Sequence, residues 1–555
     1  MEYNGNGGTY TGHCITDAAA NSHIIIQYNY LYNCAGDTLN FTAAASGGMG
    51  PTDIKVWRNH VATGSTANIY ALQMQESITD IDIEGNTFDC TASNANTSPG
   101  SACLQLESDG LTTQFTQVRI RDNKILTPGC PTAGLCWGIQ MGSFNAYNPE
   151  DIQIGPNLIL LTSANAGCGS LSWMVNAEVN LGVCDAQGNN VGYTMWEIID
   201  GTGSQYGPGV ILGENIGQGN AITLNSENAS TFSNITINGF GESGVGGTTP
   251  TAGIELDSGW AQLNIASCSE IGNIATYTTS TTINGALQPG LSVYFAGSYT
   301  PSGYGGGPYM VLTTNYNRST NTFSVALPVK GLGACTGEGT VNSVTNNNTF
   351  SGITINMPSG VDGGLASTLY GIQVRCVSMG CYTSNNNFSG ITINGTPGAA
   401  ITEDGIDFAG TGAASDSNVV NGIALNNLTN GIVSGTGTNN SIIYPKFTNV
   451  TTHLNGSTGL VLVYTPPNGT PSITGCGAVG SQTGNGFTGS FTAGQAACAA
   501  SITPGEAAPN GWLCTAYDFT HTADLFVQTV KSTTACTVSG TVTSGDVIQF
   551  SAIPY

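Results

Sequence analysis

The chain has 555 residues, a formal net charge of −24, 8% charged residues and 40% hydrophobic residues. Only ten residues are Lys or Arg, which argues against nucleic acid and anionic membranes as partners, because both are bound mainly through positive charge. The apolar content is high enough for a buried core, which excludes a wholly disordered chain, and the shortage of Lys and Arg argues against long amphipathic helices.

One short segment recurs five times in the first part of the chain. Each copy has two alternating aliphatic residues, then an Asn, then another apolar residue. The first aliphatic residues are Ile24, Ile54, Ile81, Val118 and Ile152, at separations of 30, 27, 37 and 34 residues. A second alternating segment, such as 39–41 or 104–106, lies between the copies. Two short strands per period, joined by Gly- and Asn-rich turns, predict the coils of a parallel β-helix.

The register apolar-x-apolar-x-x-Asn-x-apolar resembles the pectate-lyase-like superfamily of right-handed parallel β-helices. The resemblance extends over roughly residues 1–470 and is interrupted once. It implies an all-β solenoid, which we place at residues 1–284 and 346–465. The Asn residues of the five copies are expected to be structural, with amides that satisfy backbone groups where each strand turns. They are Asn29, Asn59, Asn86, Asn123 and Asn157.

Two segments depart from this repeat. Residues 285–345 contain alternating apolar runs at 290–296 and 321–327, which predict a small inserted β module. Residues 466–555 begin with several Pro and Gly residues typical of a linker and contain four cysteines, which predicts a separate β-sandwich-like domain. Both segments resemble modules found in phage tail proteins.

Sixteen cysteines, several of them close together in the sequence, favour an oxidising compartment. The alternative is that they are small buried apolar residues. Residues 1–4 lack the basic segment and apolar run of a signal peptide, and no stretch approaches the length of a membrane-spanning helix. Either a leader has been removed or the protein leaves its cell another way, for example inside a virus particle. Together with the cysteines, this makes us expect a protein that does not insert into a membrane and that acts outside a cell or on the surface of a virion.

Charged residues on neighbouring copies form the first candidate site. Because side chains alternate along a strand, three pairs are expected to face outward from successive coils: Lys55 and Trp57, Asp82 and Glu84, and Arg119 and Arg121. Paired carboxylates at such spacings serve glycoside hydrolases. The resemblance to lyases implies instead that Asp82 and Glu84 hold calcium against a uronate while Arg119 or Arg121 acts as base. A plainer interpretation is an inter-coil ladder of ion pairs without catalysis.

An amide column in the other strand forms the second candidate site. It comprises Asn40, Gln73, Gln105 and Gln140, whose amides match the donors and acceptors of sugar hydroxyls. Trp57 could stack on a sugar face. The alternative is a structural amide ladder between coils. The five histidines are scattered, so the sequence predicts no metal site built by the protein. We expect that the protein requires no cofactor and that calcium would bind only where it bridges acidic side chains and an acidic sugar.

Three functions fit these features. The favoured one is a glycan-recognising spike that resembles phage tailspikes, which implies a homotrimer, and that also cleaves the polysaccharide it binds. The second is a secreted polysaccharide lyase or glycoside hydrolase. The third is a non-catalytic structural adhesin or surface fibre. Whether the protein is an enzyme stays open, since the same fold hosts enzymes and inert fibres alike.

Overall fold

The computed structural model describes residues 13–18, 20–32, 34, 36–42, 49–64, 70–75, 77–92, 101–108, 115–128, 136–143, 149–162, 166–186, 194–213, 219–240, 251–258, 262–280, 287, 289–315, 321–358, 368–374, 382–396, 401–408, 415–435, 439–456, 460–463, 471–477, 479–484, 487–504, 508, 511–522 and 526–554. The chain divides into two compact units. The first comprises residues 1–451 and 455–461, and the second comprises residues 452–454 and 462–555. No helix of the described residues is long and apolar enough to cross a membrane.

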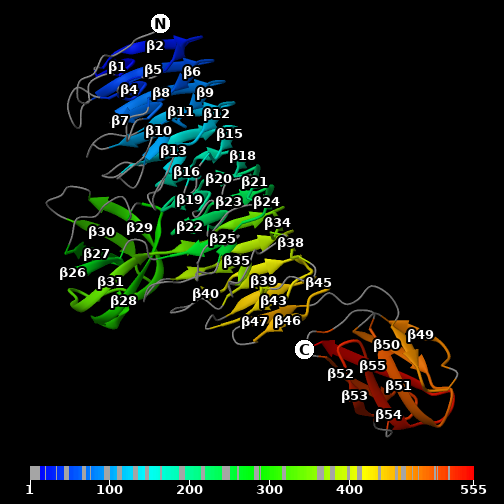
Figure 1. Ribbon diagram of the computed structural model, residues 1–555. Coiled ribbons are helices and arrows are strands. Elements are labelled where there is room, and N and C mark those ends of the chain that lie inside the picture. The colour runs from blue at the N-terminus through cyan, green and yellow to red at the C-terminus, as the bar shows by residue number, and fades with distance from the viewer. Residues whose placement is uncertain are drawn as a thin grey trace. The chain divides into compact units, whose positions relative to one another are not determined.

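The first unit contains a right-handed parallel β-helix built from three long parallel sheets, here called A, B and C (Figure 1). Sheet A consists of β1 (Ile15–Asp17), β4 (Leu39–Phe41), β7 (Leu72–Gln75), β10 (Ser101–Ser108), β13 (Cys136–Ser143), β16 (Ala166–Ser172), β19 (Trp196–Ile199), β22 (Ile222–Asn225), β25 (Thr251–Asp257), β35 (Leu369–Val374), β39 (Glu403–Asp407), β43 (Asn430–Val433) and β46 (Thr452–Asn455).

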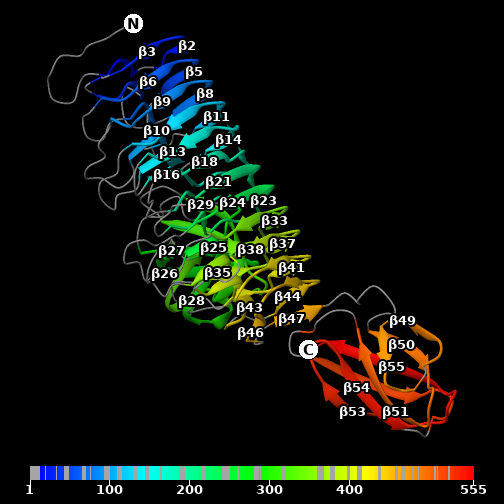
Figure 2. The same cartoon turned by 45° about the vertical axis from the view of Figure 1, so that its right-hand side comes forward.

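Sheet B stacks the recurring segments of the sequence one above the other (Figure 2). It consists of β2 (Ser22–Gln27), β5 (Met49–Trp57), β8 (Ser77–Glu84), β11 (Thr116–Arg121), β14 (Glu150–Ile154), β17 (Glu178–Val179), β20 (Gln205–Tyr206), β23 (Thr231–Ser233), β33 (Thr349–Ser351), β37 (Asn387–Ser389), β41 (Val419–Asn421), β44 (Asn440–Ile443) and β47 (Leu460–Val463). A short three-stranded sheet precedes it in three coils: β32 (Thr345–Asn346), β36 (Thr383–Ser384) and β40 (Ser415–Asp416).

Sheet C adds a third strand to every described coil except the last, so the expectation of two strands per period is wrong. It consists of β3 (Tyr30–Leu31), β6 (His60–Ala62), β9 (Thr87–Asp89), β12 (Lys124–Leu126), β15 (Leu158–Leu160), β18 (Gly182–Asp185), β21 (Gly209–Leu212), β24 (Ile235–Asn238), β34 (Thr354–Asn356), β38 (Thr392–Asn394), β42 (Ala424–Asn426) and β45 (Lys446–Thr448). These strands have two to four residues, which is too short to display an alternating pattern in the sequence.

The Asn column is the structural ladder that the sequence predicts. Each of these residues follows a turn between sheets B and C, and the turn residues Tyr28, Arg58 and Asp122 have φ angles of 55°, 52° and 56°. The Asn59 amide donates to the Asn86 Oδ1 atom (3.1 Å), and the Asn86 amide donates to the Asn123 Oδ1 atom (3.0 Å). Because Asn86 is 1% exposed, these bonds satisfy polar groups that water cannot reach.

The inserted module is a closed barrel of six strands, and its first strand begins at Gln262, before the expected start at residue 285. The strands are β26 (Gln262–Ile271), β27 (Ile274–Thr279), β28 (Ser292–Thr300), β29 (Gly306–Asn315), β30 (Thr322–Ala326) and β31 (Thr336–Ser343), with the 3-10 helix η1 (Ser302–Tyr304) between β28 and β29. The first two strands alternate apolar and polar residues as β-helix strands do, which hides the boundary from sequence analysis. Ser343 joins the barrel to the β-helix through a hydrogen bond to Ser226 (2.7 Å between the hydroxyl oxygens).

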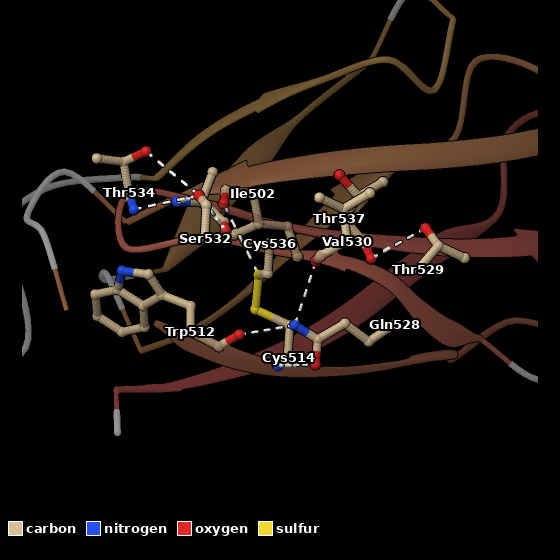
Figure 3. The surroundings of a disulfide bond; sticks show 11 residues. Ile502, Trp512, Cys514, Gln528, Thr529, Val530, Ser532, Thr534, Cys536 and Thr537 are labelled. Carbon is tan, nitrogen blue, oxygen red and sulfur yellow. Dashed lines mark hydrogen bonds between the residues drawn. A yellow bond between two sulfur atoms is a disulfide. The ribbon is translucent and has the colours of Figure 1, made fainter. Parts of the chain in front are cut away.

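The second unit is a sandwich of two four-stranded antiparallel sheets, as the sequence predicts. One sheet consists of β48 (Ser472–Thr474), β51 (Ala497–Thr503), β54 (Cys536–Thr541) and β53 (Val527–Lys531), and the other consists of β49 (Gln482–Gly484), β50 (Thr488–Thr492), β55 (Val547–Pro554) and β52 (Trp512–Asp518). The Cys514–Cys536 disulfide links the two sheets (Figure 3). Beside it, the Gln528 amide donates to the Trp512 carbonyl (2.7 Å).

Disulfides occur in both units. The described residues include Cys14–Cys34, Cys90–Cys103, Cys168–Cys184, Cys268–Cys335, Cys476–Cys498 and Cys514–Cys536. None of the described cysteines is free. The bonds support the expectation of an oxidising compartment over the alternative of buried thiols.

Candidate functional site

A concave surface lies on the outer face of sheet B, where β11, β14, β17 and β20 follow one another. Two adjoining cavities of about 420 and about 260 Å³ form it, and they share Arg119, Gln153 and Glu178 as lining residues. The larger cavity also includes Arg121, Gly155 and Gln205, and the smaller one includes Gln117, Asp151 and Asn176. We call this surface the sheet-B groove.

Strand register accounts for the polar column along the floor of this groove. Arg119 pairs with Gln153, Gln153 pairs with Glu178, and Glu178 pairs with Gln205, each on the next coil. Residues in register on parallel strands point to the same face, so the four side chains form a row spaced by about 4.8 Å per coil. All four are exposed, whereas their aliphatic neighbours Ile120, Ile154 and Val179 are buried in the helix interior.

Glycine opens room for Arg121 at the edge of the row. Gly155 lies opposite Arg121 on the next coil, and a β-carbon placed there would approach the Arg121 β-carbon to 2.5 Å. Any larger residue at position 155 would therefore displace Arg121 or the strand.

The two arginines of the groove differ in their partners. Arg121 forms an ion pair with Glu84 on the preceding coil, with 2.9 Å between the Nη2 and Oε2 atoms. No ion pair within the described part of the chain involves Arg119. The groove therefore presents one guanidinium held by a carboxylate and one that can meet an anionic or hydroxyl group of a ligand.

Two carboxylates line the smaller cavity together, and sequence analysis missed both. Asp151 and Glu178 lie on adjacent coils and are offset by two positions, since the partner of Glu178 is Gln153. A spacing of about 4.8 Å between strands and about 3.3 Å per residue places their α-carbons on the order of 8 Å apart. Glu178 was missed because β17 has only two residues and lacks the paired aliphatic residues of the repeat.

Asp82 and Trp57 lie on the coils before the groove and do not line it. Asp82 is in register with Lys55 and Arg119, as the sequence predicts, but Lys55 forms its ion pair with Asp53 instead (3.1 Å between the Nζ and Oδ1 atoms). The Lys55 ammonium also lies 5.8 Å from the centre of the Trp57 ring. Trp57 is half-buried, and its stacking on a sugar stays a prediction.

The amide column lies on sheet A, apart from the charged residues of sheet B. The Asn40 amide donates to Gln73 (2.7 Å), the Gln73 amide to Gln105 (2.9 Å) and the Gln105 amide to Gln140 (3.4 Å). Asn40 and Gln105 are only 6% and 5% exposed. The amides thus form the hydrogen-bonded ladder between coils that was the alternative interpretation. The amide column on sheet A and the charged residues on sheet B do not form a common site.

Two carboxyl groups with strongly raised pKa values lie near the junction with the barrel, outside the groove. Burial raises the pKa of Asp200 to about 8 and that of Glu227 to about 7. Glu227 accepts hydrogen bonds from the Ser230 hydroxyl (2.6 Å) and the Gly201 N–H group (2.8 Å). Both side chains are at most 1% exposed, so neither is placed to meet a polymer in solution.

No protein-family model and no curated protein matches the chain. Among solved structures, it is similar to the tailspike protein gp49 of Pseudomonas phage LKA1, with 12% identity over 91% of this chain and 67% of that one and a TM-score of 0.34. It is also similar to a tailspike protein of E. coli bacteriophage HK620 in complex with a hexasaccharide, with 10% identity over 98% of this chain and 84% of that one and a TM-score of 0.23. These tailspikes are thus what the chain is similar to among solved structures.

Proposed function

We propose that the protein is a glycan-recognising β-helix that acts outside a cell or on a virion surface and binds a polysaccharide along the sheet-B groove. The observation that carries the proposal is the exposed row Arg119, Gln153, Glu178 and Gln205 on four successive coils. A row of this length offers repeated donors and acceptors, which suits a polymer better than an isolated small molecule.

The charges in the groove favour a particular kind of sugar. The whole chain carries a net charge of −24, which repels a polyanion at a distance. At one end of the groove, however, lie Arg119, which has no ion pair within the described residues, and Arg121, whose charge is partly balanced by Glu84. We infer a mainly neutral glycan with an occasional acidic or acetamido group that reaches the arginines. Binding should not require calcium, because guanidinium groups can bond a carboxylate directly.

Cleavage of the bound glycan is the second part of the proposal. Asp151 and Glu178 line one cavity, and their α-carbons are on the order of 8 Å apart. Side chains that start from this spacing can bring two carboxyl groups to the roughly 6.5 to 9.5 Å that leaves room for a water molecule in an inverting hydrolase. This pair replaces Asp82 and Glu84 as the proposed acid and base, since Asp82 does not line the groove. The roles of Arg119 and Arg121 become binding of the sugar rather than removal of a ring proton.

The test is incubation of the purified protein with a panel of neutral and acidic polysaccharides, with and without calcium. New reducing ends are measured together with the absorbance of unsaturated uronates. We expect reducing ends without that absorbance, and loss of cleavage but not of binding in Glu178→Gln. Release of unsaturated products would contradict hydrolysis, and the absence of binding to any glycan would contradict the proposal as a whole and favour a structural fibre.

The assembly and location of the protein belong to the same proposal. The disulfides are compatible with an extracellular or virion-surface protein, since such bonds persist in oxidising surroundings. The resemblance to tailspikes implies a homotrimer, which sedimentation of the full chain would test directly. A monomer at micromolar concentration would contradict it.

A further inference from the structure

Two buried aspartates face one another at one end of the C-terminal sandwich. Asp518 is the last residue of β52, and Asp546 lies in the turn immediately before β55, the neighbouring strand of the same sheet. The side chains of Asp518 and Asp546 are 0% and 3% exposed. His521 completes the cluster, and one ligand atom from each of the three residues lies within 4.8 Å of the other two.

Each aspartate uses one of its oxygens to hold its own turn. The Asp518 Oδ1 atom accepts hydrogen bonds from the Thr520 and His521 N–H groups (2.7 and 2.8 Å). The Asp546 Oδ2 atom accepts one from the Thr543 N–H group (2.7 Å). These bonds fix the two carboxylates before any ligand arrives.

The remaining oxygen of Asp518 is the unusual feature. The Asp518 Oδ2 atom is buried and accepts no hydrogen bond within the described structure. A buried carboxylate oxygen without a partner is costly, and a second carboxylate nearby makes the cost greater. The Asp546 Oδ1 atom lies 3.0 Å from the His521 Nδ1 atom, so oxygen and nitrogen donors converge on the same point.

We propose that Asp518, His521 and Asp546 bind a divalent transition-metal ion, with zinc as the best-suited candidate. Two carboxylates and an imidazole are borderline ligands that zinc accepts, whereas calcium prefers oxygen donors alone. Three protein ligands leave at least one position for water, and the half-exposed imidazole places that position at the protein surface. The ion would tie the end of β52 to the turn that leads into β55.

The disulfide of the same strand gives the site a rigid support. Cys514, four residues before Asp518 on β52, is bonded to Cys536 on the opposite sheet (Figure 3). Beyond Asp518 the backbone stays attached to β55, because the Phe519 N–H group donates to the Val547 carbonyl (2.8 Å) and the Val547 N–H group donates to the Thr520 hydroxyl (2.9 Å). Because the backbone is fixed before and after Asp518, the metal ligands lose little conformational entropy when they bind an ion.

The experiment uses the full chain after treatment with a chelator and exhaustive dialysis. Zinc binding is measured by titration calorimetry and by elemental analysis, and cobalt is used as a spectroscopic probe. We expect one equivalent of zinc per chain, cobalt absorption bands typical of mixed nitrogen and oxygen ligands, and a higher unfolding temperature of the C-terminal domain with zinc.

Three variants and one control assign the site. His521→Ala and Asp546→Asn should each weaken zinc binding by at least about tenfold, because even the loss of an outer-shell partner of a ligand typically costs about 10- to 100-fold. Asp518→Asn keeps an oxygen that can accept the hydrogen bonds of the turn, and it should also weaken zinc binding. His23→Ala is the matched control, since His23 pairs with Asp53 in the β-helix and forms no three-residue cluster within the described residues. Absence of zinc binding by the wild type, or binding unchanged in His521→Ala, would overturn the proposal.

Discussion

Arg121 and Glu84 lie on adjacent coils of sheet B and form an ion pair, with 2.9 Å between the Nη2 and Oε2 atoms. Both side chains of the pair are exposed to solvent, so the pair contributes less than about 1 kcal/mol to the stability of the stacked coils. Its main consequence is to orient the Arg121 guanidinium at the edge of the sheet-B groove, where a ligand can reach the remaining N–H groups.

Replacement of Arg121 by Ala should therefore separate binding from stability. We expect glycan affinity to fall about tenfold or more, because a charge-assisted hydrogen bond contributes about 1.5 to 3 kcal/mol, while the unfolding temperature stays nearly unchanged. Lys124→Ala is the control, since Lys124 is an exposed cation of the same coil on sheet C. Equal losses in both variants would indicate a general charge effect instead of a specific contact.

Gly155→Ala tests the space beside Arg121. The new methyl group would lie 2.5 Å from the Arg121 β-carbon, so the side chain or strand must shift. Glycan affinity should fall, and the double variant Gly155→Ala and Arg121→Gly, which lacks the clashing β-carbon, should bind no more weakly than Arg121→Gly alone, because both changes act through one side chain. Calorimetric titration of the three variants measures this coupling, and fully additive losses would argue against it.

The Asn ladder should be most sensitive at its centre. Asn86→Ala removes the acceptor of the Asn59 N–H group (2.8 Å) and the donor to the Val56 carbonyl (2.7 Å), both of them buried. Unsatisfied buried groups cost about 1 to 3 kcal/mol each, so the free energy of unfolding should fall by about 3 kcal/mol. Asn29→Ala, at the half-buried end of the ladder, should cost about 1 kcal/mol. Urea unfolding distinguishes the two, and equal effects would contradict a ladder that is weaker at its end.

Stability should decrease as pH rises through the neutral range. Burial raises the pKa of Asp200 from 3.8 to about 8 and that of Glu227 from 4.5 to about 7. The folded state binds these protons more tightly than the unfolded state does. The stabilisation is fully present below the unfolded pKa values and is lost as the pH rises through the folded ones.

Unfolding free energies measured from about pH 5 to about pH 9 should fall by an amount on the order of a few kcal/mol. Asp200→Asn cannot ionise and should flatten part of this slope while keeping the shape of the side chain. A stability that rises over the same range in the wild type would contradict the protonation of these buried acids.

The sequence predicts the strands that are long enough to show an alternating pattern and misses those that are too short. Ile54, Ile81 and Val118 repeat the same alternation, so the β-helix, its outward charges and the Asn ladder follow from the spacing. The third strand of each coil escapes detection because residues such as 87–89 are too few to alternate visibly.

The groove depends on what lies in register across coils, which no local pattern contains. Glu178 meets Gln153 only through the stacking of β17 on β14, although continuing the coil register past Ile152 would have pointed to it. The Asp518, His521 and Asp546 cluster combines residues from two turns of the sandwich, and its scattered spacing led the sequence to predict no metal site. The sheet-B groove and the cluster of Asp518, His521 and Asp546 are therefore found from the proximity of residues in the folded structure and not from their spacing in the sequence.

The most direct test of the central claim is the structure of the protein soaked with an oligosaccharide from the polymer that binds best in the panel. We expect the sugar to lie along β11, β14, β17 and β20, with contacts to Arg119 and Glu178. Sugar bound elsewhere, for instance over the amide ladder of sheet A, with the sheet-B groove unoccupied at saturating ligand, would contradict the account.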